Sequence, residues 1–209
     1  MNTKTPIRIL VVGCGNMGIS HATAYHNFPE FDICGLVSRG DSKSKLNKQL
    51  QADYPLFTDF DEALSQTKPD AVCISTYPDS HEDFALKCLE AGCHVFIEKP
   101  LADSIAGCER IIAKAKKVNK KVVVGYILRH HPSWIRFIEE AEKLGKPLVM
   151  RMNLNQQSQG YMWDVHRDDK IKTYFSFCDR GTTYQRYIRR QLQLRPAPDS
   201  LRRWICRLV

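Results

Sequence analysis

The stretch IRILVVGCGNMG, residues 7–18, decides the fold of this chain. Its first six residues are mostly apolar and β-branched, which predicts a short parallel strand that is buried on both faces. The glycines that follow, in the pattern G-x-G-x-x-G, come directly after that strand and before a stretch typical of a helix. The stretch therefore predicts a strand, a tight turn and a helix, the opening unit of a doubly wound α/β domain.

The glycine turn is a candidate phosphate site. In this pattern Gly13 permits the tight turn, Gly15 lets the backbone approach a pyrophosphate, and Gly18 lets the helix pack closely on the strand. The free N–H groups and the positive dipole end at the start of the helix attract phosphates. We predict that the turn binds a dinucleotide through Gly13, Gly15, Asn16, Met17 and Gly18. The alternative is a plain strand–turn–helix in which the glycines serve the turn only.

Strands and helices alternate along the first 125 residues. Apolar runs predict strands at 7–12, 31–37, 71–75, 94–97 and 122–125, and the stretch 52–57 is expected to include a short strand. The stretches between them predict helices, and Asp79 and Asp103 are expected to be N-caps of two of these helices. The alternation predicts an α/β fold whose parallel sheet is covered by helices on both faces. A helix from about Pro132 and a strand over 148–154 predict the start of a second, incomplete α+β domain.

The end of strand 31–37 bears on which dinucleotide fits. An acidic residue about 20 positions after the glycines typically binds the ribose 2′-hydroxyl of NAD. Position 38 is a serine instead, followed by Arg39, with Lys43 and Lys45 nearby. A hydroxyl and a guanidinium suit a 2′-phosphate better, so we favour NADP over NAD. The alternative for these basic residues is a solvated helix start.

Composition excludes several classes of protein. Hydrophobic residues make up 43% and charged residues 26%, which excludes wholesale disorder. No apolar run approaches the roughly 20 residues that cross a bilayer, and the run at 7–12 leads into glycines rather than a cleavage site, so we expect a cytoplasmic protein without a membrane contact. None of the eight cysteines forms a C-x-x-C pair, which favours reduced core thiols and no metal. A zinc site at Cys88, Cys93 and His94 is therefore disfavoured.

Positive charge is concentrated in the last 42 residues. Residues 168–209 contain 10 Lys or Arg and 4 Asp or Glu, whereas residues 1–167 contain 21 Lys or Arg and 19 Asp or Glu. Arginines interleaved with aromatic residues are one way to bind single-stranded nucleic acid. We favour a solvated tail without a dedicated partner over a nucleic-acid site.

Glu98, Lys99 and Pro100 come directly after strand 94–97, at the edge of the sheet where ligands bind. A lysine beside a glutamate at this place is either a surface pair of little consequence or a proton donor and acceptor. The pattern of these three residues alone leaves both readings open.

Several motifs in order resemble one family. They are STYPDSH at 75–81, LEAGCHV at 89–95, EKPLA at 98–102, the opening GCGNMG, and Gly125-Tyr126-x-x-Arg129-x-x-Pro132. Together they resemble the glucose–fructose oxidoreductase / inositol dehydrogenase (Gfo/Idh/MocA) family over about residues 6–167. The resemblance implies a Rossmann domain at 1–128, the start of a substrate and oligomerisation domain at 129–167, and an atypical basic tail at 168–209.

The resemblance also implies an activity and a set of residues. It implies NAD(P)-dependent hydride transfer to or from a sugar, a cyclitol or a related polyol. Lys99 matches the family's catalytic lysine, and Arg129 matches a position near the mouth of the active site. The implied cofactor-binding residues are the glycine turn, Ser38 and Arg39, and then Ser75, Thr76, Pro78, His81, Glu98, Lys99, Pro100 and Arg129. For His81, an exposed place in the first turn of a helix is the equal alternative.

The tail departs from the family's pattern. Family members carry an Asp-x-Gly-x-His motif in the second domain, and Thr183 occupies the slot of its histidine here. A threonine hydroxyl does not exchange a proton near neutral pH as an imidazole does. We therefore keep a non-catalytic dinucleotide-binding or regulatory module as the alternative function. We expect the tail to be an aberrant ending of a truncated product, and a homo-oligomer only where the second domain is complete.

Overall fold

The structure is a computed structural model that describes residues 5–145, apart from the side chain of Leu128. The chain divides into two compact units, residues 1–126 and 127–209. The expected strand at 148–154, Thr183 and the basic tail lie outside the described residues. The expected domain limit at residue 128 stays a prediction.

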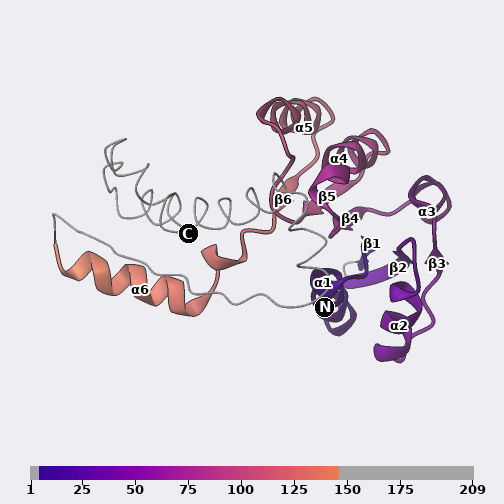
Figure 1. The fold of residues 1–209 in the computed structure, drawn as a ribbon, viewed down its shortest axis with the longest axis horizontal. Coiled ribbons are helices and arrows are strands. Elements are labelled where there is room, and N and C mark those ends of the chain that lie inside the picture. The colour runs from indigo at the N-terminus through magenta and orange to yellow at the C-terminus, as the bar shows by residue number, and fades with distance from the viewer. Residues whose placement is uncertain (1–4, 146–209) are drawn as a thin grey trace, which may run out of the picture. The chain divides into compact units, whose positions relative to one another are not determined.

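The first unit is built on one parallel sheet of six strands, and Figure 1 shows its strands between two layers of helices. The strands are β1 Ile7–Val12, β2 Phe31–Val37, β3 Leu56–Phe57, β4 Ala71–Ile74, β5 His94–Ile97 and β6 Val122–Val124. Their order in the sheet is β3-β2-β1-β4-β5-β6. The order reverses between β1 and β4, which is the point where ligands bind in such sheets. The predicted α/β fold is confirmed.

The helices cover both faces of this sheet. They are α1 Asn16–Asn27, α2 Ser42–Gln49, α3 Phe60–Thr67, α4 His81–Glu90 and α5 Ile105–Lys117. Alternate residues of β1 point to opposite faces, so Leu10 packs with α3, α4 and α5, while Ile9 packs with α1 and α2. Two separate apolar cores hold the sheet between the helix layers. This burial fixes the loops at the strand ends.

Two strand details follow from close contacts. A Cβ on Gly35 in β2 would lie 2.9 Å from the ring of Phe57, so a glycine is needed for β3 to pack there. The short strand expected within 52–57 is β3 Leu56–Phe57, and just before it the side chain of Asn47 bonds both backbone groups of Tyr54. The Asn47 amide thus satisfies the backbone N–H and C=O of Tyr54 outside the sheet.

The helix caps correct two expectations. Pro78 starts a 3-10 turn, η1 Pro78–Ser80, so Asp79 lies inside that turn and Ser80 is the N-cap of α4. Ser104, not Asp103, caps α5, since its Oγ accepts the Gly107 N–H at 3.0 Å. Both expected caps were wrong by one residue: Ser104 takes the capping bond of α5, while the hydroxyl of Ser80 bonds Thr76 and Tyr77 and makes no cap bond.

The second unit is described only from Ile127 to Gly145. It contains the 3-10 turn η2 Ile127–Arg129 and the helix α6 Pro132–Lys143. The ring of His131 caps α6 by accepting the Ser133 N–H, and Ile138 is buried. No helix among the described residues is long and apolar enough to span a membrane.

Candidate functional site

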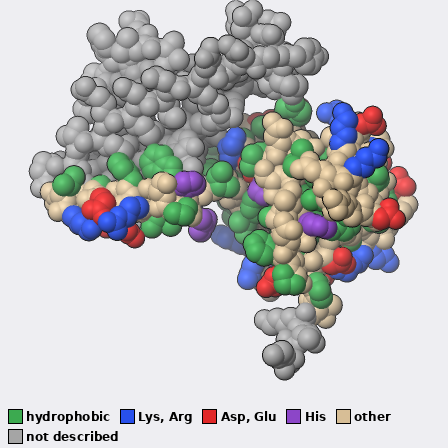
Figure 2. Space-filling model, turned by 90° about the horizontal axis from the view of Figure 1, so that it is seen from below, with side chains coloured by type: hydrophobic (Ala, Val, Ile, Leu, Met, Phe, Trp, Pro, Cys, Tyr) green, Lys and Arg blue, Asp and Glu red, His purple; other side chains and the backbone are tan. Residues whose placement is uncertain are grey.

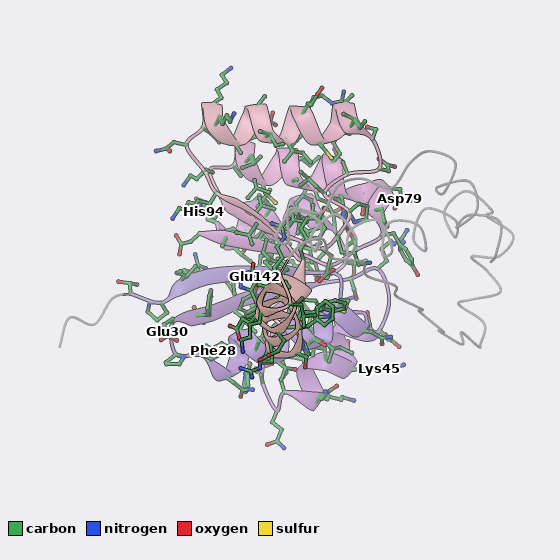
Figure 3. The ribbon with its side chains drawn as sticks, turned by 90° about the vertical axis from the view of Figure 1, so that its left-hand side faces the viewer. Phe28, Glu30, Lys45, Asp79, His94 and Glu142 are labelled. Atoms are coloured by element: carbon green, nitrogen blue, oxygen red, sulfur yellow. The ribbon has the colours of Figure 1, made fainter. Side chains whose placement is uncertain are left out.

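The candidate site lies at the carboxyl ends of the strands. Figure 3 shows Asp79, in the turn after β4, and Lys45, in α2 after β2, at the opposite side of the first unit from Glu30 and His94. Glu30 precedes β2, and His94 begins β5. The loops after β1, β2, β4 and β5 therefore share the edge of the sheet where the sequence places its candidate residues. Figure 2 shows acidic and basic side chains scattered together over one face of this unit.

The three glycines of the phosphate turn have different surroundings. Gly13 has φ +90°, and a Cβ there would lie 2.5 Å from the Ser75 carbonyl oxygen. A Cβ on Gly18 would collide with the Gly13 carbonyl. A Cβ on Gly15 would meet nothing within 4 Å, so packing inside the protein does not demand a glycine there. Space outside Gly15 is what a pyrophosphate on the backbone requires.

The start of α1 suits an anion. Gly15 is its N-cap, no side chain bonds to the cap, and the first turn holds no acidic residue. The first N–H groups of the helix therefore point out of the turn without a side chain that competes with a phosphate. Cys14 in this turn is buried, and burial raises the pKa of its thiol to about 11. Cys14 thus packs as a neutral thiol, with its Sγ 3.6 Å from the Val37 carbonyl oxygen.

The loop after β2 is tied together by Lys43. Its ammonium donates to the carbonyl oxygens of Ser38, at 2.8 Å, and Gly40, at 2.9 Å. The Ser38 hydroxyl donates to Gly40 and accepts from the Ser42 hydroxyl and the Lys43 N–H. Arg39 is exposed beside this loop. The structure therefore brings Ser38, Arg39 and Lys43 together at one strand end.

His81 links two loops of the site. Its ring is fully buried, with Nδ1 2.7 Å from the Pro100 carbonyl oxygen and Nε2 3.1 Å from that of Thr76. The expected alternative, an exposed first-turn histidine, is therefore wrong. Pro78 begins the turn just before His81, and the Thr76 hydroxyl bonds that of Ser80 at 2.7 Å. His81 holds the segment after β4 against the segment that carries Lys99.

Glu98 is a buried carboxylate at the end of β5. Its Oε1 lies 2.8 Å from Nε2 of His21 in α1, and its Oε2 accepts the Lys99 N–H at 3.3 Å. Burial alone raises the pKa of Glu98, but the hydrogen bond and charge of His21, together with the N–H and charge of Lys99, outweigh it and hold that pKa below 4.5. Glu98 is therefore ionised near neutral pH. A Cβ on Gly125 would lie 2.9 Å from its Oε1, so glycine leaves the room that this carboxylate occupies.

Lys99 is half-buried, and its peptide bond to Pro100 is cis. Among residues 5–145, its ammonium makes no hydrogen bond and no ion pair. Arg129 belongs to the second unit, in η2, and its role stays a prediction. Within the described part of the chain, no group of three or more His, Cys, Asp or Glu side chains is placed to hold a metal ion.

Three residues of the site were missed by the sequence analysis as functional candidates. His21 and Gly125 surround Glu98, and Lys43, noted only for its charge, holds the loop of Ser38. The histidine lies 77 residues from its glutamate, and no local spacing pairs them. The one signal in the sequence that could have pointed to His21 is its position on the helix that follows the glycine turn.

Known proteins match this chain in sequence. The model of the GFO_IDH_MocA oxidoreductase family, described as an NAD-binding Rossmann fold, matches residues 7–126. A 4-carboxy-2-hydroxymuconate-6-semialdehyde dehydrogenase of Sphingobium sp. is 29% identical over 173 residues, 77% of this chain and 54% of that protein. A myo-inositol 2-dehydrogenase of Thermotoga maritima is 26% identical over 148 residues, 70% of this chain and 44% of that protein. The chain spans about half the length of these curated relatives.

Solved structures match it as well. The structure of GenD2 from gentamicin A biosynthesis, in complex with NAD, is 27% identical with a TM-score of 0.61, over 68% of this chain and 40% of that one. The scyllo-inositol dehydrogenase of Lactobacillus casei, with NAD(H) and scyllo-inositol bound, is 26% identical with a TM-score of 0.60. The match covers 66% of this chain and 42% of that one. Since the family model covers more than half of the chain and the sheet has the order of a Rossmann fold, this chain belongs to the Gfo/Idh/MocA oxidoreductase family.

Proposed function

We propose that this chain binds a nicotinamide dinucleotide across the carboxyl ends of its strands. The observation that carries the proposal is the contrast within the glycine turn. Gly13 and Gly18 are enclosed by protein, while the space at Gly15 is open and a side chain would fill it. A glycine with no internal reason to be one indicates that a ligand approaches the backbone there. The NAD-bound and NAD(H)-bound relatives support the same ligand class.

The residues divide into groups along the dinucleotide. The diphosphate binds Gly13, Gly15, Asn16, Met17 and Gly18, and the adenosine ribose lies near Ser38 and Arg39. Ser75, Thr76 and Pro78 line the middle of the site, and the buried His81 holds their segment against the segment of Lys99. Glu98, Lys99 and Pro100 lie at the nicotinamide end, and the role of Arg129 in binding the cofactor stays a prediction.

The proposed reaction is the interconversion of a hydroxyl and a carbonyl group on a sugar, a cyclitol or a related polyol. A bound nicotinamide supplies or accepts the hydride. The amine of Lys99 takes the hydroxyl proton as the alcohol is oxidised and returns it as the carbonyl is reduced. An ammonium without a competing hydrogen bond among the described residues supports this role.

We favour NADP over NAD. The guanidinium of Arg39 is exposed at the end of β2, and Lys43 holds the backbone of the same loop in place. An arginine binds a phosphate through two parallel hydrogen bonds, and no acidic residue stands at position 38 to bind a free 2′-hydroxyl.

Fluorescence titration of the full chain with NADPH and NADH tests the binding proposal, and mass spectrometry identifies any nucleotide that copurifies. Binding of NADPH, lost in Gly15→Val, is the expected result; failure of the folded chain to bind either nucleotide refutes the proposal. Turnover on a panel of polyols then separates the enzyme from the second candidate, a dinucleotide-binding module without catalysis. Thr183 in place of a histidine favours that candidate, and binding without turnover would support it.

A further inference from the structure

The contact between His21 and Glu98 joins the two ends of the proposed site. His21 lies in α1, whose first turn contains Asn16 and Met17 of the phosphate turn. Glu98 immediately precedes Lys99. Both side chains are nearly buried, with 15% of His21 and 8% of Glu98 exposed. The phosphate end and the lysine end of the site are thus connected through one buried polar contact.

The direction of each hydrogen bond is set by the chemistry. An ionised carboxylate only accepts, so Nε2 of His21 donates to Oε1 over 2.8 Å. The second oxygen, Oε2, accepts the backbone N–H of Lys99. The rings of Phe96 and His21 make a T-shaped contact with their centroids 4.7 Å apart, and Gly125 leaves the carboxylate its space. His21 therefore bonds one carboxylate oxygen of Glu98, while the other oxygen of Glu98 bonds the backbone N–H of Lys99.

We propose that His21 is a positioning residue that fixes Lys99 through the carboxylate of Glu98. This inference rests on the proposed function, since it assigns a residue to the lysine end of that site. Among the described residues, the His21 ring bonds Glu98 and contacts Phe96, and it bonds neither the phosphate turn nor the lysine side chain. Its effect on a ligand should therefore be felt only by the part of the ligand that reaches Lys99.

Two variants separate positioning from packing. His21→Phe keeps a ring beside Phe96 but removes the N–H donor. His21→Gln loses the ring but places an amide N–H at a similar reach, so it should restore the bond to Glu98. A packing role predicts that the phenylalanine is tolerated and the glutamine is harmful. A positioning role predicts the opposite order.

The first measurement is hydrogen exchange of the Lys99 amide in the full chain without ligand, followed by NMR. We expect exchange about tenfold faster in His21→Phe and within about twofold of the wild type in His21→Gln. Amides in the middle of β1 should be unchanged in both. Unchanged exchange at Lys99 in His21→Phe, or equal acceleration in β1, overturns the proposal.

The second measurement compares NADPH with 2′-phospho-ADP-ribose, which lacks the nicotinamide. We expect His21→Phe to weaken NADPH binding about fivefold or more and to leave binding of the shorter ligand within about twofold. Equal weakening of both ligands contradicts positioning. If the wild type binds neither ligand, the proposed function fails, whereas the exchange result still decides whether His21 fixes the lysine segment.

Discussion

The imidazole of His81 lies 2.7 Å from the carbonyl oxygen of Pro100, across 19 residues of sequence. Its other nitrogen lies 3.1 Å from the Thr76 carbonyl oxygen, and the ring is fully buried. One side chain thus joins the loop after β4, at the middle of the proposed site, to the loop after β5, at its nicotinamide end. The arrangement of these loops depends on a residue that need not touch a ligand.

We predict that His81→Phe lowers the free energy of unfolding by roughly 1–3 kcal/mol, because a buried carbonyl loses its donor. The variant should also weaken dinucleotide binding, since the two loops are no longer joined. Urea unfolding and NADPH titration measure the two effects. His26→Phe is the control, because that ring is exposed and bonds only the Tyr54 hydroxyl in the described structure. Equal stability of His81→Phe and wild type would exclude the linking role.

Substitutions at Gly15 and Gly18 should separate folding from binding. Gly15→Val places its Cβ in open space and at an unstrained φ of −81°, so the loss of stability should be smaller than in Gly18→Ala while NADPH binding is lost. Gly18→Ala brings a Cβ into the Gly13 carbonyl and should destabilise the fold by more than about 1 kcal/mol. Thermal unfolding and titration of both variants check this. A Gly15→Val protein that still binds NADPH would refute the phosphate site.

Much of this site was visible in the sequence, and the reasons are local. The glycine turn follows a strand directly, and the segment Glu98–Pro100 follows another, so the rule for ligand position in parallel sheets places both at one edge. Ser38 was identified as a candidate in the same way, because it directly follows strand 31–37. These inferences needed only strand ends and their order along the chain.

What was missed depends on tertiary contacts. The pairing of His21 with Glu98 needs a side chain of α1 to reach the end of β5, which depends on the sheet order and not on any spacing. The bonds from the Asn47 side chain to the backbone of Tyr54, just before β3, are a second such contact. The cap of α4 moved to Ser80 because Pro78 forms a separate turn before the helix. Each case is a specific contact that propensity does not encode.

Lys99→Ala should abolish any turnover, by about 100-fold or more, and leave NADPH affinity within about twofold. The reason is that the amine moves a proton and is not needed to hold the diphosphate. Steady-state rates on an accepted polyol and fluorescence titration measure the two quantities. Lys116→Ala, at the exposed end of α5, is the matched control. An unchanged rate would show that Lys99 plays no chemical part.

Arg39→Asp should shift the ratio of affinities from NADPH toward NADH by about tenfold or more, since a charged hydrogen bond to phosphate is replaced by repulsion. The new carboxylate can also accept from a free 2′-hydroxyl. Titration with both nucleotides gives the ratio. Lys45→Asp changes the charge of α2 by the same amount and serves as control. If both variants shift the ratio equally, general charge and not Arg39 selects the nucleotide.

The buried Glu98 should make stability depend on pH. Its folded pKa is below 4.5, so its contribution to stability is present above that usual value and is lost as the pH falls through the folded pKa. The free energy of unfolding of the wild type should therefore fall more steeply between about pH 5.5 and 3.5 than that of Glu98→Gln. Urea unfolding across this range is the measurement, with Glu109→Gln on the exposed face of α5 as control. Parallel curves for wild type and Glu98→Gln would contradict the assignment.

The neutral thiol of Cys14 gives the phosphate turn an internal chemical reporter. With a pKa raised to about 11 and almost no exposed surface, this sulfur reacts slowly with alkylating reagents while the turn keeps its shape. Each opening of the turn exposes it, and a covalent label then records the event. The alkylation rate of Cys14 would thus report how often the turn opens. A nucleotide that holds the turn closed would lower this rate.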